Sequence, residues 1–360
     1  MLKLQELSNG HALLAFGWAL FERHGLRAKL DLRTDAVLEY LASVESGYRD
    51  VAYHNAVHGA DVAHALHWLL CSDSLLPMTR DDPLLLFTAI IATLAHDLGH
   101  DGFNNAFHTH SNSDIAIASC YQAPLERFHL SQAFKLLAKK DSMLCKMPLA
   151  ERKQVQTWMR EIVLATDFGV HMDVINEFKA MLEMRGCTPK PQTADEEAAA
   201  AEAAALLAKS ASAPAVVVGS NKAADDDTFV ASDFEAGEKI LTIKMAIKTA
   251  DLGYLTKGRA YCHVWTERVL EEFFTQGDTE KSLGLPVSFG CDRDAVNIPQ
   301  SQLGFYQFMI DPLYKAMNLL VPMDQQMRNL DMMRGVWQAK KDADEGKGQK
   351  KDEDDSGNDD

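Results

Sequence analysis

An almost unbroken apolar run, Leu84–Leu94, is the feature that most constrains how this chain can fold. Exposing such a run to water would be costly, so it predicts a buried helix. The helix leads directly to His96 and Asp97, and His100 follows a few residues later. Buried imidazole and carboxylate groups are unfavourable unless a partner compensates their polarity, and a metal ion is a common partner. The run therefore places His96 and Asp97 where a metal ion could compensate them, provided that the rest of the chain supplies the missing ligands.

Further candidate ligands lie both before and after this run. Nine of the 13 histidines fall between positions 54 and 129. His54 and His58 are four residues apart, which predicts that they share one face of a helix. Far downstream, Asp251 ends another apolar helical segment. Together with His96 and Asp97, these side chains form a mixed nitrogen and oxygen set. Such a set suits zinc with an open position, or two divalent cations bridged by a carboxylate.

Each of these features has a plainer interpretation when it is taken alone. A single buried histidine is usually a hydrogen-bonded core residue, and a His-x-x-x-His pair on a helix is often structural. Asp251 alone would more often be a cap or turn residue than a ligand. Only the combination of His58, His96, Asp97 and Asp251 indicates a metal centre.

Apolar residues recur at helical spacing along most of the chain, and convincing strand patterns are absent. We therefore predict an all-α fold, a compact multi-helix domain spanning residues 1–340. One expected helix covers Ala36–Ser46, with Asp31, Thr34 and Asp35 as candidate caps. The other helices are expected at 84–94, 114–122, 125–139, 150–167, 172–184, 234–249, 261–275, 300–318 and 321–339, with an irregular loop at 277–299.

Two segments break this pattern. Residues 188–232 are rich in Ala, Ser and Pro, and we expect a low-complexity, disordered insertion there. Residues 341–360 form an acidic stretch that we expect to be a disordered tail. These two regions hold most of the formal net charge of −16. Because the remainder is only mildly acidic, a basic nucleic-acid-binding surface is not expected.

The composition also bears on the cellular setting. Six cysteines are scattered without any Cys-x-x-Cys pair, which favours reduced thiols and a cytoplasmic location. No apolar stretch is long enough for a membrane span, and no secretory signal is visible at the start. The sequence does not identify protein partners.

Seven blocks, in order along the chain, resemble the catalytic domain of the class I cyclic nucleotide phosphodiesterases. The first is Tyr53-His54-Asn55-x-x-His58-x-x-Asp61-Val62. The others are His96-Asp97-x-x-His100-x-Gly102-x-x-Asn105-x-Phe107, Ala165-Thr166-Asp167, Ala250-Asp251-Leu252, Trp265-Thr266-Glu267-Arg268, Glu272-Phe273-Phe274-x-Gln276-Gly277-Asp278 and Ser301-Gln302-x-Gly304-Phe305. Because the resemblance begins near Phe16, we expect a short or absent first helix and no regulatory module ahead of it.

The resemblance implies an HD-type metal phosphohydrolase fold and a specific reaction. By position, the zinc ligands would be His58, His96, Asp97 and Asp251, and a second ion, Mg²⁺ or Mn²⁺, would share Asp97. A bridging hydroxide would attack the phosphorus of a 3′,5′-cyclic nucleotide, and His54 would protonate the departing 3′ oxygen. The product would be the 5′-monophosphate, so the reaction would end cyclic nucleotide signalling.

The resemblance also assigns supporting residues. Gln302 would hydrogen-bond the purine edge and Phe305 would stack on its plane; Val269, Phe273 and Tyr53 would complete the substrate pocket. The amide of Gln302 can rotate to serve adenine or guanine, and we favour cAMP over cGMP. The positions expected to orient ligands and metal-bound waters are His100, Asn105, Glu126, His129, Thr166 and Asp167.

Some positions depart from the family pattern, and two other functions remain open. Asp101 stands where proline is usual, which adds a carboxylate near the site, and Tyr254 replaces an asparagine that often contacts the nucleotide. One alternative function is that of another HD-type phosphohydrolase acting on nucleotides, although the Gln302 and Phe305 block argues against it. The other is a degenerate domain that binds a cyclic nucleotide without hydrolysing it, although every expected ligand is present.

Overall fold

The computed structural model describes the backbone of residues 1–187 and 231–355, and the side chains as far as residue 345. All regular elements in these ranges are helical, which confirms the predicted all-α class. None of these helices is both long and apolar enough to cross a membrane. The elements are α1 (Leu2–Leu7), α2 (Ala12–Arg23), α3 (Leu26–Lys29), α4 (Thr34–Gly47), α5 (Ala56–Leu70), α6 (Leu76–Arg80), α7 (Pro83–Leu94), α8 (Asn105–His110), α9 (Asp114–Ala118), α10 (Pro124–Leu137), α11 (Leu149–Leu164), η1 (Phe168–Val170), α12 (His171–Met184), η2 (Ala231–Asp233), α14 (Ala236–Asp251), η3 (Gly253–Thr256), α15 (Arg259–Leu283), α16 (Ile298–Phe305), the π-helix η4 (Tyr306–Ile310), α17 (Asp311–Asn318) and α18 (Asp324–Asp355).

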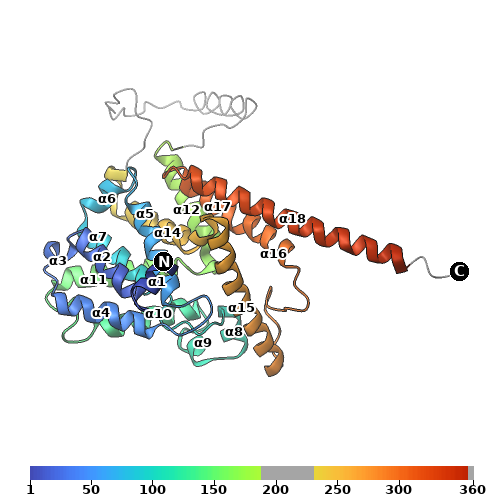
Figure 1. Cartoon of the computed structure of the whole chain (residues 1–360). Helices are drawn as coiled ribbons and strands as arrows, with labels where there is room; N and C mark the ends of the chain where they lie inside the picture. The colour runs from blue at the N-terminus through green and yellow to red at the C-terminus, as the bar shows by residue number, and fades with distance from the viewer. Residues whose placement is uncertain (188–230, 356–360) are drawn as a thin grey trace, which may run out of the picture.

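Helix α7 is the buried helix that the apolar run predicted. Every residue from Leu85 to Leu94 is buried, and the helix packs against α11, α5 and α2. The helix begins where expected, because the Asp82 side chain accepts a hydrogen bond from the Leu85 N–H at 3.0 Å and Pro83 occupies the first turn. Helix α14 crosses the same core and packs against α5, α11 and α12 (Figure 1). Its last residue, Asp251, has Oδ1 3.4 Å from Nε2 of His96, just after the end of α7.

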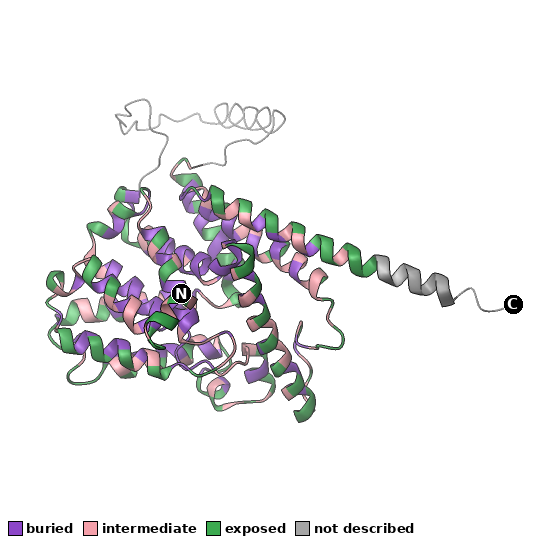
Figure 2. Ribbon diagram, viewed as in Figure 1, coloured by how far each residue is buried: buried purple, intermediate pink, exposed green. Residues whose placement is uncertain are grey.

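Two long helices, α15 and α18, lie in the C-terminal part of the chain. Helix α15 runs obliquely beside the core, and α18 extends away from the body of the protein (Figure 1). Buried residues concentrate where the helices face one another, and the outward surface of α18 is largely exposed (Figure 2).

Two sequence predictions of helix limits were wrong. Helix α4 begins at Thr34 after Arg33, with no side-chain cap from Asp31, Thr34 or Asp35. The predicted loop at 277–299 is helical up to Leu283, because α15 continues through Gly277. That glycine is required by packing: a Cβ there would lie 1.9 Å from the carbonyl oxygen of Cys291.

Helix α18 continues to Asp355, into the acidic segment that was expected to be a disordered tail. Its first acidic residues are placed for helical pairing, since Lys341 lies 3.8 Å from Glu345, one turn away. Residues 356–360 lie outside the described residues. The predicted insertion also lies outside them, except for Ala231 and Ser232, which begin η2.

Candidate active site

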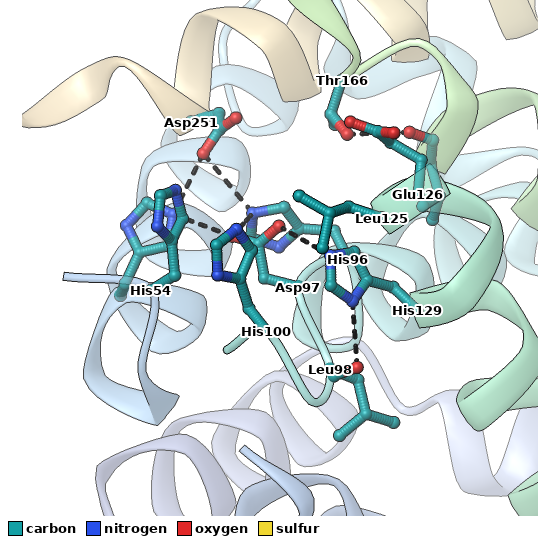
Figure 3. Close-up of polar contacts among 12 residues, drawn as sticks. His54, His96, Asp97, Leu98, His100, Leu125, Glu126, His129, Thr166 and Asp251 are labelled. Atoms are coloured by element: carbon teal, nitrogen blue, oxygen red, sulfur yellow. Dashed lines mark hydrogen bonds and ion pairs between the residues drawn. The ribbon is translucent and has the colours of Figure 1, made fainter. Parts of the chain in front are cut away.

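Four side chains from three segments converge beside the end of α7. His58 comes from the first turn of α5, His96 and Asp97 come from the turn after α7, and Asp251 is the last residue of α14. One ligand atom from each lies within 4.8 Å of the others. Figure 3 shows Asp97 among the surrounding histidines, with Asp251 facing them from α14. The structure thus brings together the four residues that the sequence nominated as metal ligands.

The distances between these donor atoms fit one tetrahedral metal ion. His58 Nε2 lies 3.1 Å from Asp251 Oδ1 and 3.4 Å from Asp97 Oδ2. His96 Nε2 lies 3.0 Å from Asp97 Oδ2 and 3.4 Å from Asp251 Oδ1. Ligands about 2.0–2.1 Å from a tetrahedral zinc are separated by about 3.3 Å. His96 Nε2 and Asp97 Oδ2 are buried without a hydrogen-bond partner despite their proximity, as expected for atoms that face a cation.

The electrostatics of the cluster point the same way. Burial raises the pKa of Asp97 and of Asp251, but hydrogen bonds and attraction from His58 and His96 outweigh it and hold both values well below the usual range. Burial lowers the pKa of His96, but the two carboxylates raise it well above its usual range. The carboxylates therefore demand a positive charge between them, which a divalent cation would supply in place of a proton.

His54 lies beside this cluster and is held by Glu272 of α15. The sequence placed His54 on the helix face of His58, but α5 begins only at Ala56, so that prediction was wrong. The Asn55 side chain caps the helix by accepting from the N–H groups of Val57 and His58, which leaves His54 in the preceding bend. The two rings nevertheless lie close together, with centroids 5.6 Å apart.

Glu272 fixes both the backbone and the ring of His54. Its Oε2 accepts hydrogen bonds from the Tyr53 N–H at 2.8 Å and the His54 N–H at 3.1 Å, and its Oε1 pairs with His54 Nδ1. Burial lowers the pKa of His54, but the Glu272 charge and hydrogen bond, with Asp97 and Asp251, raise it to about 8. Sequence reasoning placed Glu272 in a motif and gave it no role, because 218 residues separate it from His54.

His100 and His129 extend a stack of imidazoles from His54. His100 stacks on His54 with ring centroids 4.0 Å apart, and on His129 at 5.5 Å (Figure 3). Burial and the nearby His54 lower the pKa of His100 well below its usual range. Burial lowers the pKa of His129 to about 4, and its Nδ1 lies 3.0 Å from the Leu98 carbonyl oxygen. His54 is therefore the member of this stack that carries a proton near neutral pH.

The other expected supporting residues fall into two groups. Asn105 donates to both oxygens of Glu126, at 3.0 and 3.3 Å. Burial, and then the charge of Asp167, raise the pKa of Glu126 to about 7. Thr166 and Asp167 make local hydrogen bonds instead. The Thr166 hydroxyl donates to the Val163 carbonyl, and the Asp167 carboxylate accepts from the Gly169 N–H.

Lys248 is a buried residue that sequence reasoning missed. It donates to the carbonyl oxygens of Ala165 and Asp167 and so ties this segment to α14.

Asp101, which the sequence placed as an extra carboxylate near the metals, belongs to a separate contact. Its Oδ1 lies 3.2 Å from Nε2 of the buried His108, and His108 Nδ1 lies 2.9 Å from the Ser113 hydroxyl. Asp101 is not among the residues whose ligand atoms form the cluster. The structure therefore assigns Asp101 to a contact between the loop that precedes α8 and His108 of α8.

The expected base-binding residues line up along α15 and α16. Gln302 is buried, and its Oε1 has no hydrogen-bond partner. Phe305 is partly buried, with its ring centroid 6.4 Å from that of Phe168. Val269 and Phe273 are partly buried on α15.

Tyr53 and residues of α15 link the expected base-binding residues to the four candidate metal ligands. The buried Tyr53 ring contacts His58 at 4.6 Å, Trp265 at 5.4 Å and Tyr254 at 5.7 Å between centroids. On the same face of α15, the Cys262 sulfur lies 4.0 Å from the hydroxyl of Tyr306, which follows Phe305. Tyr254, which stands where the family usually has asparagine, is thus buried against the Tyr53 ring.

Comparison with known proteins gives one consistent result. The model of the 3′,5′-cyclic nucleotide phosphodiesterase family matches residues 53–331. A probable 3′,5′-cyclic-AMP phosphodiesterase of Caenorhabditis elegans, pde-4, is 31% identical over 325 residues, covering 90% of this chain and 42% of that protein. A probable 3′,5′-cyclic phosphodiesterase of the same organism, pde-1, is 31% identical over 313 residues, covering 86% of this chain and 40% of that protein. This chain thus spans less than half the length of these relatives.

The fold is also found among solved structures. The phosphodiesterase domain of the rhodopsin phosphodiesterase of Salpingoeca rosetta superposes with a TM-score of 0.75 at 20% identity, covering 94% of this chain and 90% of that one. At this identity the likeness concerns the fold alone, and it places the helices described above in a known arrangement.

Proposed function

Because this chain belongs to the 3′,5′-cyclic nucleotide phosphodiesterase family, we propose that it hydrolyses a 3′,5′-cyclic nucleotide to the 5′-monophosphate. The observation that carries the proposal is the position of His54, which is paired with Glu272 beside four converging metal-ligand atoms. A hydrolytic phosphodiesterase needs these two components, an activated water and a proton donor for the leaving oxygen.

The four donor residues define the metal requirement. His58, His96, Asp97 and Asp251 would hold Zn²⁺, and Asp97 would be shared with a second divalent ion, Mg²⁺ or Mn²⁺. Bound ions of this kind neutralise phosphate charge and lower the pKa of water, which makes hydroxide available near neutral pH. Asp97 is buried, and its backbone N–H donates to Tyr48 Oη at 3.4 Å. This contact helps to keep the Asp97 carboxylate directed toward the other ligands.

His54 would complete the reaction as the general acid. Hydrolysis forms a bond from water oxygen to phosphorus and breaks the bond from phosphorus to the 3′ oxygen, which must gain a proton. Since Nδ1 of His54 pairs with Glu272, Nε2 is the nitrogen available to donate that proton. A pKa of about 8 keeps His54 charged at neutral pH, and stacking on the neutral His100 fixes the plane of its ring.

We propose that Gln302 and Phe305 bind the purine. The unpaired Oε1 of a buried glutamine is costly unless a ligand satisfies it, and the purine edge offers complementary groups. Phe305 would stack on the base, with Val269, Phe273 and Tyr53 forming the remaining wall. We favour cAMP as the substrate, which is supported by the cyclic-AMP phosphodiesterase among the similar proteins.

We also propose a reducing, cytoplasmic setting. This is supported by the free thiols of Cys71, Cys120, Cys145, Cys262 and Cys291.

A direct assay tests this function. Hydrolysis of cAMP and cGMP is measured with Mg²⁺ or Mn²⁺ for the wild type, His54→Ala and Asp97→Ala, with product identified as 5′- or 3′-monophosphate. We expect the 5′-monophosphate from the wild type and a severe loss of rate in both variants. Binding of a cyclic nucleotide without turnover would indicate a degenerate binding domain. Hydrolysis of other nucleotides alone would indicate a different HD-type phosphohydrolase.

A further inference from the structure

A second group of metal-ligand side chains lies at the other end of α5. His67 and Cys71 are four residues apart at the C-terminal end of this helix, and His24 caps the C-terminal end of α2 opposite them. His24 Nε2 lies 3.2 Å from His67 Nδ1, and Cys71 Sγ lies 3.5 Å from His67 Nδ1. All three side chains are partly buried, so that solvent can still reach them.

We propose that His24, His67 and Cys71 form a second metal site that binds one Zn²⁺ through two imidazole nitrogens and one thiolate. A water molecule would fill the fourth position. The site lies apart from the candidate active site: His67 is nine positions after His58 on α5, about 14 Å along the helix.

The donor spacing fits this ion. Tetrahedral zinc separates two nitrogen ligands by about 3.3 Å, and a nitrogen and a sulfur ligand by about 3.6 Å. The observed separations are 3.2 and 3.5 Å. Cys71 Sγ is also 3.8 Å from His67 Nε2, so the sulfur lies over the ring, and metal binding would require the cysteine side chain to rotate toward Nδ1.

The protonation states also suit a zinc site. Burial, and then nearby positive charge, lower the pKa of His24 and lower that of His67 to about 4, so both imidazoles offer lone pairs at neutral pH. Burial raises the pKa of the Cys71 thiol and Arg23 opposes this, so binding must release the thiol proton. The C-terminal ends of α2 and α5 both carry partial negative charge, which favours a cation between them and counteracts the nearby positive charge of Arg23.

A bound ion would join α2 to α5, the helix whose first turn carries His58. Without an ion, the same contacts amount to hydrogen bonds between neutral side chains. The metal-bound and metal-free states can be distinguished by the bond from the Cys71 thiolate to the ion, which exists only in the metal-bound state.

Cobalt substitution tests the proposal on the full chain. Metal-free protein is titrated with Co²⁺, and the near-ultraviolet charge-transfer band from thiolate to cobalt is recorded. The active-site donors are nitrogen and oxygen only, so this band reports the cysteine site. We expect the band in the wild type and in Cys145→Ser, whose thiol is exposed and outside the cluster, and its loss in Cys71→Ser. Zn²⁺ should displace Co²⁺ and abolish the band.

Variants separate this site from the catalytic one. Asp97→Asn should abolish hydrolysis and leave the band intact, so failure of either proposal can be recognised alone. His24→Asn should weaken Co²⁺ binding at the cysteine site at least about tenfold. Circular dichroism establishes that each variant is folded, and His24→Asn replaces Cys71→Ser as the decisive variant if the latter does not fold. A band that is absent in the wild type, persists in Cys71→Ser, or saturates only at millimolar Co²⁺ overturns the proposal.

Discussion

Glu272 holds His54 in place across 218 residues of sequence, with one carboxylate oxygen on the imidazole and the other on two backbone N–H groups. This contact joins the middle of α15 to the segment before α5. It leaves Nε2 as the nitrogen of His54 that is available to donate a proton, and the Glu272 charge raises the pKa of His54. The first prediction follows from this pairing.

Glu272→Gln should shift the alkaline limb of the pH–rate profile to lower pH. The raised pKa of His54, about 8, means that the acid form is complete well below pH 8 and is lost as pH rises through that value. Removing the carboxylate charge should lower this limit by about 1–3 pH units. Steady-state rates between pH 6 and 9.5 measure the shift. Glu271→Gln, at the exposed neighbouring position, serves as the control; an unchanged limb in Glu272→Gln would refute the role of Glu272.

Removing the metal should destabilise the protein as well as inactivate it. An ion that binds only the folded state, at a concentration 100 times its Kd, contributes about 2.7 kcal/mol to the free energy of unfolding. Chelation should therefore lower Tm, and Zn²⁺ with Mg²⁺ should restore it.

Asp97→Asn keeps the size of the side chain but removes the shared charge, so we expect at least about a hundredfold loss of kcat. If Asp97→Asn retains full activity, the ligand assignment is wrong.

Asp101→Asn should leave the metal dependence of the rate unchanged. Its carboxylate pairs with His108 and lies outside the ligand cluster, so the substitution weakens a partly buried contact between the loop before α8 and α8 itself. We expect a modest loss of stability, about 1–3 kcal/mol, measured by urea unfolding. A changed order of preference among Zn²⁺, Mg²⁺ and Mn²⁺ would contradict this assignment.

Phe305→Ala should reduce kcat/KM for the nucleotide without removing the metal. Stacking of a base on an aromatic ring is worth about 1–3 kcal/mol, which corresponds to about 5- to 150-fold. Phe308→Ala, three residues further on and 65% exposed, is the matched control. Gln302→Ala should weaken binding and alter the ratio of kcat/KM for cAMP and cGMP. Equal effects of the two phenylalanine variants would argue against a stacking role for Phe305.

Two glycines in helices should respond oppositely to alanine. At Gly277 a Cβ would lie 1.9 Å from the Cys291 carbonyl oxygen, so Gly277→Ala must displace the backbone and should cost about 1–3 kcal/mol or more. At Gly335 of α18 a Cβ meets nothing within 4 Å, so Gly335→Ala should stabilise by about 0.5–1 kcal/mol. Thermal unfolding of both variants tests the close approach; stabilisation by Gly277→Ala would show that the Cys291 backbone does not pack against α15 as described.

The sequence by itself determined the helical class, the burial of α7 and the four metal-ligand candidates. Helical periodicity and motif spacing are local properties, and each ligand is fixed by its place at a helix end: His58 in the first turn of α5, Asp251 at the end of α14. The ordered blocks then indicated the family, which the comparisons confirmed.

Only the tertiary structure decided how these elements act on one another. It placed His54 before α5 and bound it to Glu272, paired Asp101 with His108, and carried α15 through Gly277 toward the Cys291 backbone. It also brought His24 to His67 and Cys71. Such contacts join residues that are distant along the chain, and their existence depends on helix packing angles and side-chain directions. Local sequence patterns carry no direct record of either, so the partners of each polar group emerge only when the helices pack.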